Sequence, residues 1–169
     1  MIDFDHSLLT LLLNSRRMWL DEVMLLASAL GAGGFIWWVT AMITMVFPNK
    51  RAAAWRMILV IAFTYLISDV SLKSLIARDR PFTVDPAIIV IDARPSSSAF
   101  PSGHAAMAAA GALAGSRMLP GSAWVWWPFA LVVAISRVYI GVHWPSDVIG
   151  GVLIGVACAW FVLGGRKRH

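Results

Sequence analysis

Six ionisable side chains stand at the ends of long apolar runs, where charged groups are uncommon. They are, in chain order, Lys73, Arg80, His104, Arg137, His143 and Asp147. A charged side chain at membrane depth costs on the order of 2.5–3.5 kcal/mol on insertion scales. Several such groups at one level of a bilayer therefore indicate a shared ligand. Cations that neutralise oxygens, together with imidazoles that attack or donate a proton, suit a tetrahedral phosphate.

The stretch Phe100-Pro101-Ser102-Gly103-His104 leads into the apolar run AAMAAAGALAG. Ser102 is a suitable N-cap, so the free N–H groups and the positive end of the helix dipole would form an anion cradle. Gly103 would let a ligand approach the backbone closely. Ordinary capping explains Pro101, Ser102 and Gly103 taken alone. His104 favours the anion site, because an apolar helix has little use for an imidazole.

The stretch Ser136-Arg137 to Asp147 reads SRVYIGVHWPSD. Pro145 fits the first position of a helix, which leaves His143 just outside it and Asp147 in its first turn. The helix dipole stabilises the Asp147 carboxylate, which can reach back and keep one ring nitrogen of His143 protonated. The other nitrogen would then be free to attack or to accept a proton. The alternative is that Asp147 only caps the helix and His143 is an interfacial loop residue.

The three cations indicate a phosphate site only when they are considered together with the histidines and Asp147. Lys73 and Arg80, each taken alone, would be explained by snorkelling toward the headgroups, whereas Arg137 offers a planar fork suited to phosphate. The residues leave open which histidine attacks, although Asp147 as a partner favours His143. No Asp/Glu cluster suits Mg²⁺ and only two histidines are in place, so we expect no metal and no cofactor.

The composition predicts an integral membrane protein of one domain, residues 1–169. Of the 169 residues, 59% are hydrophobic and 14% charged, with a mean hydropathy of +0.75, where soluble domains carry about 25% charged residues. The first residues are acidic, so we expect no cleavable signal peptide. With Cys158 as the single cysteine, a disulfide framework and a cysteine metal site are excluded. Basic loops explain the net charge of +5 more simply than nucleic-acid binding does. The sequence specifies no oligomeric state.

The hydropathy pattern predicts an all-α polytopic bundle of about five transmembrane helices. The expected spans are 23–47, 52–76, 103–119, 123–140 and 145–163. Residues 1–19 are expected to form an amphipathic helix that lies at the interface or is partly inserted, and residues 77–102 are a polar loop. The nine tryptophans, including the pairs at 37–38 and 126–127, are expected to anchor the protein at the membrane interface.

The cations predict the orientation in the membrane. Five spans place the N-terminus, the 77–102 loop and the GVHWP turn on one side. The other side carries seven cations: Lys50, Arg51, Arg56, Arg117, Arg166, Lys167 and Arg168. Of the seven cations on the first side, three are assigned to the site, which leaves Arg16, Arg17, Arg78 and Arg94. The positive-inside rule therefore predicts that the site faces away from the cytoplasm.

The order and spacing of these motifs resemble the three-part signature of the type 2 phosphatidic acid phosphatase (PAP2) superfamily. The matching segments are Lys73 with Arg80-Pro81, then Pro101 to His104, then Ser136-Arg137 with His143 and Asp147. The resemblance covers about residues 68–165, and the N-terminal third carries none of it. It implies a metal-independent phosphatase with His143 as nucleophile, Asp147 orienting it and His104 as general acid. It also implies phosphate binding by Lys73, Arg80, Ser102, Gly103, Arg137 and Ser136.

The resemblance admits other functions and several substrates. The family also contains soluble vanadium haloperoxidases, which five spans and small size disfavour. A lipid-binding protein with an inactive site is disfavoured by the intact signature, and a transporter by the absence of paired broken helices at the midplane. The small chain, which lacks large insertions, most resembles the bacterial polyprenyl diphosphate phosphatases, and this resemblance makes undecaprenyl diphosphate the first candidate. The alternatives are phosphatidate, phosphatidylglycerophosphate and a lipid A phosphate, with Arg78 and Arg94 in the loop that would discriminate among them.

Overall fold

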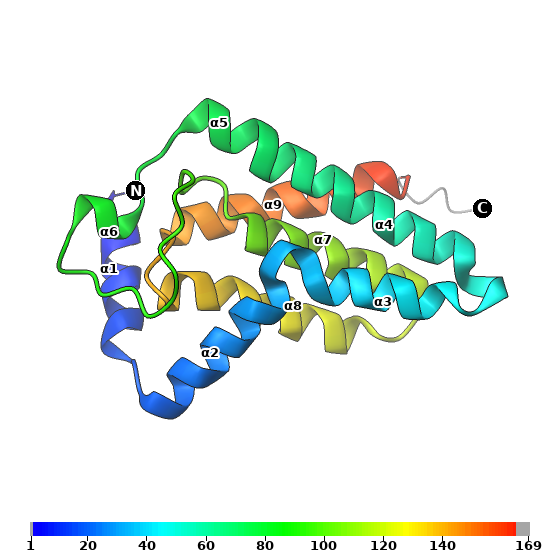
Figure 1. The fold of residues 1–169 in the computed structure, drawn as a ribbon, viewed down its shortest axis with the longest axis horizontal. Helices are drawn as coiled ribbons and strands as arrows, with labels where there is room; N and C mark the ends of the chain where they lie inside the picture. The colour runs from blue at the N-terminus through cyan, green and yellow to red at the C-terminus, as the bar shows by residue number, and fades with distance from the viewer. Residues whose placement is uncertain (1, 165–169) are drawn as a thin grey trace.

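The computed structural model describes residues 2–164, and every regular element within that range is a helix (Figure 1). The α-helices are α1 (Ile2–Asn14), α2 (Met18–Gly31), α3 (Phe35–Met45), α4 (Arg51–Tyr65), α5 (Lys73–Ile76), α6 (Pro81–Val84), α7 (Gly103–Met118), α8 (Ala123–Tyr139) and α9 (Pro145–Val162). Short 3₁₀ turns lie at Ala32–Gly34 (η1) and Pro48–Lys50 (η2), and Leu66–Leu72 (η3) is π-helical. The expected all-α bundle is confirmed.

Three helical segments in the described chain are long and apolar enough to cross a membrane. They are Met18–Met45, Pro48–Val84 and Pro145–Val162, which coincide with the first, second and fifth expected spans. The other two expected spans form shorter helices, the apolar α8 and the Ala/Gly-rich α7.

The elements on the two predicted sides of the membrane lie at opposite ends of the bundle. The α1 helix and the loop that carries α6 lie at one end, and the turn between α3 and α4 lies at the other (Figure 1). The C-terminal cations Arg166, Lys167 and Arg168, on which the predicted orientation partly depends, lie outside the described residues.

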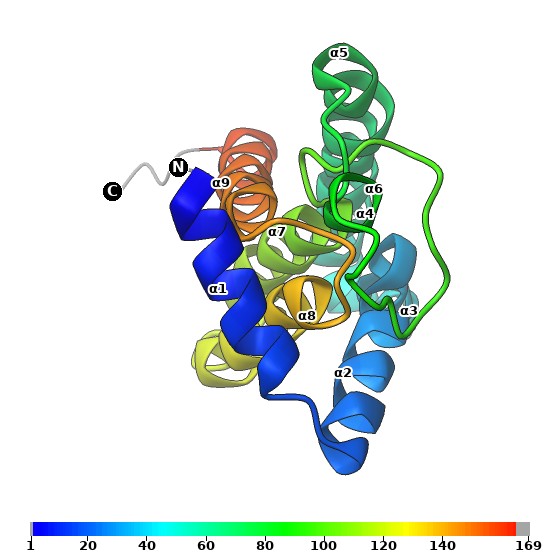
Figure 2. The ribbon, with the colours of Figure 1, turned by 90° about the vertical axis from the view of Figure 1, so that its left-hand side faces the viewer.

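Helix α7 is the central helix and contacts α4, α8 and α9 (Figure 2). Its small residues permit this, because all of the alanines from Ala105 to Ala114 are buried. On the facing helix, a Cβ added at Gly155 would collide with the carbonyl oxygen of Ala106. Small residues at such contacts let backbones approach closely in a membrane bundle. Gly103 at the start of α7 is thereby held rigidly in the middle of the fold.

Two irregularities interrupt the first two expected spans, which the hydropathy pattern predicted as continuous. Gly33 and Gly34 have φ values of 56° and 73°, a left-handed conformation that glycine adopts without steric cost. The first span is therefore broken into α2 and α3. The second span passes through the π-helical turn η3 before Lys73. Such turns occur often at functional sites.

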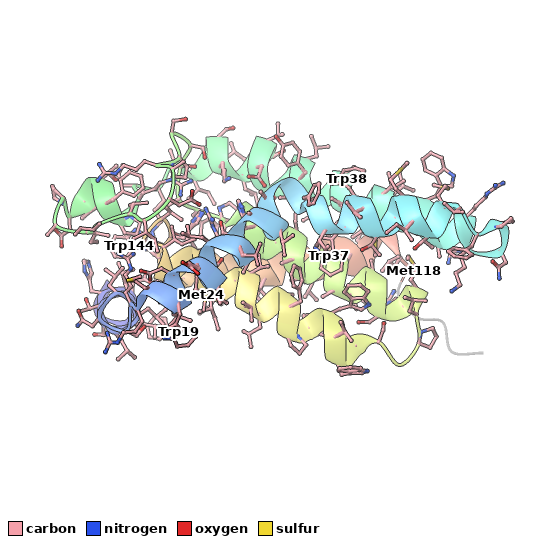
Figure 3. All side chains as sticks on the ribbon, turned by 60° about the horizontal axis from the view of Figure 1, so that its bottom comes forward. Trp19, Met24, Trp37, Trp38, Met118 and Trp144 are labelled. Carbon is pink, nitrogen blue, oxygen red and sulfur yellow. The ribbon has the colours of Figure 1, made fainter. Side chains whose placement is uncertain are left out.

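Neighbouring tryptophans of α3 have different roles (Figure 3). Trp37 is fully buried, its indole lies against Gly111 of α7, and its ring centroid is 5.3 Å from that of Trp126. Trp38 is 37% exposed. The expectation that both anchor the protein at the membrane interface is wrong for Trp37, because the glycine opposite it opens a slot in the core that the large ring fills.

Helix α1 is shorter than the expected 1–19 segment, since a new helix begins at Met18. It lies across the ends of α8 and α9 (Figure 2). Its Leu9 is 1% exposed and its Asp5 is 2% exposed. The helix is therefore packed onto the bundle by one face, next to the turn that carries His143.

Candidate active site

A cavity of about 200 Å³ opens between η1, η3, α7 and the end of α8; we refer to it as the site cavity. Five of the residues singled out from the sequence line it: Lys73, Arg80, His104, Arg137 and His143. They come from all three motif segments of the chain. The structure thus brings together the cations and both histidines of the predicted phosphate site, and adds Asp69, which the sequence reasoning did not assign to it.

His143 is fixed with its two ring nitrogens in different surroundings. Its Nε2 lies 3.4 Å from Nη1 of Arg80, and its Nδ1 lies 3.7 Å from Oδ2 of Asp147. The second distance is too long for a hydrogen bond but close enough for an ion pair if the ring is charged. Burial, reinforced by the positive charges of Arg80, Arg137 and Lys73, holds the pKa of His143 well below its ordinary value. The imidazole is therefore neutral at pH 7, as a nucleophile must be.

Asp147 is completely buried and caps its helix, while its role in orienting His143, whose Nδ1 lies 3.7 Å from Oδ2, stays a prediction. Its Oδ2 accepts a hydrogen bond of 2.8 Å from the backbone N–H of Trp144, which caps α9. Its Oδ1 accepts a hydrogen bond of 2.5 Å from the guanidinium of Arg78. A buried carboxylate needs such partners to remain charged. Asp147 therefore lies behind His143 rather than in the cavity.

Arg80 connects the polar loop to the nucleophile candidate. Its guanidinium donates to the carbonyls of Ser97, Ser98 and Val142 at 2.7, 3.1 and 2.7 Å. The hydroxyl of Ser98 donates in turn to the carbonyl of Lys73 at 2.7 Å. The loop is thus anchored over the cavity by Arg80, which is 4% exposed.

Three buried polar atoms at the site have no hydrogen-bond partner among the described residues: Nε of Arg137, the hydroxyl of Ser102 and Nδ1 of His143. The Arg137 guanidinium also donates to the hydroxyl of Ser28 on α2. Unpaired buried donors are costly, so they favour a polar ligand at the site. Ser136 differs, because its hydroxyl donates to the carbonyl of Val133 at 2.7 Å within its own helix. It does not line the cavity, so the phosphate-binding role implied for it has no support here.

Asp69 lies in the π-helical turn η3, and its side chain contacts the start of α7. Its carboxylate pairs with Lys73 and accepts a hydrogen bond of 2.7 Å from the Ser68 hydroxyl. A Cβ added at Gly103 would collide with both carboxylate oxygens, so the carboxylate lies directly against the N-terminus of α7. The spacing of Asp69 and Lys73, four residues apart, is typical of a helical ion pair. That spacing could have predicted from the sequence that Asp69 pairs with Lys73.

A second group that the sequence reasoning missed lies behind Asp147. Asp5 of α1 accepts hydrogen bonds from the backbone N–H and the hydroxyl of Ser146, at 2.8 and 2.6 Å, and pairs with Arg78 at 2.8 Å. Burial opposes the charged form of Asp5, but these hydrogen bonds outweigh it and lower its pKa. Arg78 therefore bridges α1 to Asp147. No local pattern could reveal this bridge, because the three residues are far apart in the sequence.

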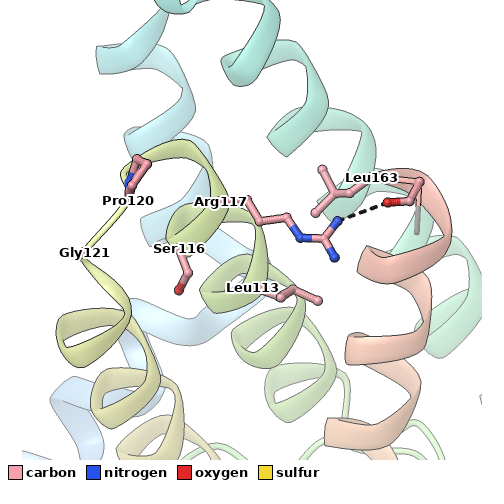
Figure 4. Close-up of a pocket in the computed structure, with 7 residues that line it drawn as sticks. Leu113, Ser116, Arg117, Pro120, Gly121 and Leu163 are labelled. Atoms are coloured by element: carbon pink, nitrogen blue, oxygen red, sulfur yellow. Dashed lines mark hydrogen bonds between the residues drawn. The ribbon is translucent and has the colours of Figure 1, made fainter. Parts of the chain in front are cut away.

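A larger hollow of about 690 Å³ lies at the opposite end of the bundle. Leu113 and Arg117 of α7 and Leu163 after α9 line it, and Arg117 donates to the carbonyl of Gly164 at 3.3 Å (Figure 4). None of the histidines or acidic residues discussed above lines it. The chemistry is therefore concentrated in the smaller site cavity.

Comparison with known proteins gives a family and close relatives. Residues 53–168 match the model of the PAP2 superfamily. The undecaprenyl-diphosphatase of Sulfolobus acidocaldarius is 29% identical over 157 residues, covering 91% of this chain and 74% of that protein. The decaprenylphosphoryl-5-phosphoribose phosphatase of Mycobacterium tuberculosis is 36% identical over 160 residues, covering 88% of this chain and 86% of that protein.

A solved structure extends the likeness to the N-terminal helices. The transmembrane PAP2-type phosphatidylglycerolphosphate phosphatase of Bacillus subtilis superposes with a TM-score of 0.79 at 31% identity, covering 97% of this chain and 87% of that one. The resemblance read from the motifs is thereby confirmed. It also reaches further than the motifs, which leave the N-terminal third unmatched.

Proposed function

The chain belongs to the PAP2 superfamily and is an integral membrane phosphatase of that type, and we propose that it dephosphorylates a lipid through a phosphohistidine on His143. The observation that carries this proposal is the placement of His143. Its Nε2 lies 3.4 Å from Nη1 of Arg80, while Asp147 lies on the Nδ1 side. A neutral imidazole so placed can direct its free electron pair at a phosphorus held by the cations.

The proposed reaction has two steps. Nε2 of His143 attacks phosphorus, the bond from phosphorus to the leaving oxygen breaks, and His104 donates its proton to that oxygen. Water then attacks the phosphorus of the phosphohistidine, the bond from phosphorus to Nε2 breaks, His104 takes a proton from that water, and inorganic phosphate leaves. Asp147 stabilises the positive charge that attack places on the His143 ring, whose Nδ1 keeps its proton. Lys73, Arg80 and Arg137 stabilise the equatorial oxygens, and Ser102 and the N-terminus of α7 at Gly103 contribute further donors. Each charge in this scheme comes from the chain itself, so the reaction is proposed to need no metal ion.

Undecaprenyl diphosphate is the proposed substrate, with an isoprenoid monophosphate as the leaving group. Two observations support a lipid. The site cavity lies beside the start of α7 in an apolar bundle, and the relative from S. acidocaldarius carries the name undecaprenyl-diphosphatase. Phosphatidylglycerophosphate is the second candidate, because the B. subtilis structure is of a phosphatase for that lipid. Phosphatidate and lipid A phosphates complete the set to be tested.

The first test is phosphate release by the purified protein in detergent with EDTA. The panel contains undecaprenyl diphosphate, phosphatidylglycerophosphate, phosphatidate and a lipid A phosphate, with His143→Ala as the blank. We expect release from undecaprenyl diphosphate well above the other lipids and none in the blank. Preference for another lipid would correct the substrate. No release from any lipid by the wild-type protein would favour a lipid-binding protein with an inactive site.

We also propose that the site faces the periplasm or exterior of a bacterial inner membrane, because the order of the spans along the sequence assigns seven cations to the other side and four, outside the site, to this one. Ala93 in the polar loop and Asn49 in the α3–α4 turn are both exposed, whereas the native Cys158 is buried. An impermeant maleimide added to intact cells should label Ala93→Cys and not Asn49→Cys. The opposite pattern would place the site in the cytoplasm.

A further inference from the structure

We propose that Asp69 is an internal anion that competes with phosphate for the site and drives inorganic phosphate out after turnover. The inference rests on the proposed function and deepens it. Three contacts place the Asp69 carboxylate: the ion pair with Lys73, the hydrogen bond from Ser68, and the close approach to Gly103. Two of these partners, Lys73 and the α7 N-terminus, are the groups proposed to hold a phosphate oxygen.

The Asp69 carboxylate therefore lies at the position that a phosphate oxygen is proposed to take. A helix N-terminus binds an anion through its free N–H groups and its dipole, and the Asp69 carboxylate already lies against Gly103. Asp69 and Lys73 are 17% and 13% exposed, so solvent screens little of the repulsion between a carboxylate and a phosphate. Binding of phosphate must displace the carboxylate from Gly103 and from Lys73.

A neutral hydrogen-bond acceptor could position Lys73 without repelling a bound phosphate, whereas Asp69 carries a charge. Lys73 already has a second constraint, because its carbonyl accepts the hydroxyl of Ser98 from the loop. An anionic partner for a phosphate-binding lysine weakens the binding of every anion at the site. This penalty falls most heavily on inorganic phosphate, which has no lipid chain. A lipid phosphate can offset it through apolar contacts of its chain with the bundle, remote from the reacting atoms.

The inference predicts a gain of anion affinity on neutralising Asp69. Asp69→Asn removes the charge and keeps the shape of the side chain. We expect the inhibition constant of inorganic phosphate, measured against a lipid substrate in detergent, to fall by about tenfold or more, since a single charge a few ångströms away shifts the pKa of a neighbouring group by about 1–3 units. Slower release of phosphate should also lower kcat together with KM.

Three variants make the test specific. Asp85→Asn changes the same charge on an exposed residue that does not line the cavity, and should leave phosphate inhibition unchanged. Ser68→Ala removes the hydroxyl that holds the carboxylate and should produce a smaller change than Asp69→Asn. Asp69→Ser replaces Asp69→Asn if the latter is poorly folded, as judged by thermal unfolding in detergent.

The outcomes separate this inference from the proposed function. If wild-type protein hydrolyses a lipid and Asp69→Asn is inhibited by phosphate equally or more weakly, Asp69 merely positions Lys73 and the inference is wrong. If wild-type protein hydrolyses no lipid, the proposed function fails by itself. Calorimetric titration of inorganic phosphate into wild type and Asp69→Asn then tests the inference without turnover. Tighter binding to the variant supports it, and equal or weaker binding overturns it.

Discussion

Oδ1 of Asp147 accepts a hydrogen bond of 2.5 Å from Arg78, a residue at the start of the polar loop, while Oδ2 of the same carboxylate lies 3.7 Å from Nδ1 of His143. The carboxylate that we propose to orient the nucleophile is therefore itself held from behind by a cation. This cation lies between Lys73 and Arg80 but is not one of the motif positions. The site is thus supported by contacts that extend past the groups expected to touch substrate.

Removing that support should slow the chemical step. With Arg78→Ala, the Asp147 carboxylate loses its guanidinium partner and is free to turn away from His143. We expect kcat to fall by roughly 10- to 100-fold, because small misplacements of a reacting group are costly, while KM changes little. Arg78→Lys should recover part of the rate. Steady-state kinetics that showed a rise in KM alone would instead assign Arg78 to headgroup binding.

Asp5 should make stability depend on pH in one direction. Its folded-state pKa is lowered, so its contribution is fully present above the ordinary aspartate pKa of about 3.9 and is lost as pH falls through the folded value. Asp5→Asn should therefore cost about 2 kcal/mol at pH 7, as for hydrogen bonds to a charged group, and progressively less below pH 4. Thermal unfolding in detergent between pH 3 and 8 measures this. A cost that is independent of pH would contradict the charged role of Asp5.

His104 should matter most when the leaving group is poor. A general acid contributes roughly 10²–10⁴-fold to a rate, and this benefit disappears for a leaving group that needs no proton. His104→Ala should therefore abolish turnover of a lipid phosphate but still release nitrophenol from p-nitrophenyl phosphate in a rapid burst. The burst would be followed by slow turnover, since His104 also activates water. Equal losses with both substrates would remove His104 from the acid role.

The contact between α7 and α9 should tolerate no added methyl group. Gly155→Ala places a Cβ into the backbone of α7 at Ala106, and overpacking of this kind costs about 1–3 kcal/mol. The matched control is Leu153→Ala on the same helix, where the native side chain is 64% exposed. We expect a clear fall in the unfolding midpoint for Gly155→Ala and little change for the control. Equal midpoints would show that the two helices can separate.

The sequence predicted the residues of the site better than the residues that hold them in place, such as Arg78 and Asp5. His104, Arg137 and His143 stood out because ionisable side chains are expensive in apolar runs, and glycine and proline mark helix starts by their backbone preferences. The five spans followed from hydropathy. These are local signals, and the fold confirmed the all-α bundle that they predicted.

What the sequence missed depends on contacts between distant residues. The bridge from Asp5 through Arg78 to Asp147 joins three segments that come together only in the folded chain. The burial of Trp37 depends on the glycine that faces it from α7. The break at Gly33 and Gly34 was visible in composition, but hydropathy alone favoured a continuous span. Asp69 could have been predicted from the sequence, because it lies four residues before Lys73, the spacing of a helical ion pair. It was missed because Asp69 is not one of the motif positions.

The most direct test of the account is to look for the phosphorylated residue. His104→Ala is mixed with p-nitrophenyl phosphate, quenched in base, digested and examined by mass spectrometry, with His143→Ala treated in parallel. The account predicts an acid-labile, base-stable phosphoryl group on His143, absent from the parallel sample. A phosphoryl group on another residue, or lipid hydrolysis that persists in His143→Ala, would contradict it.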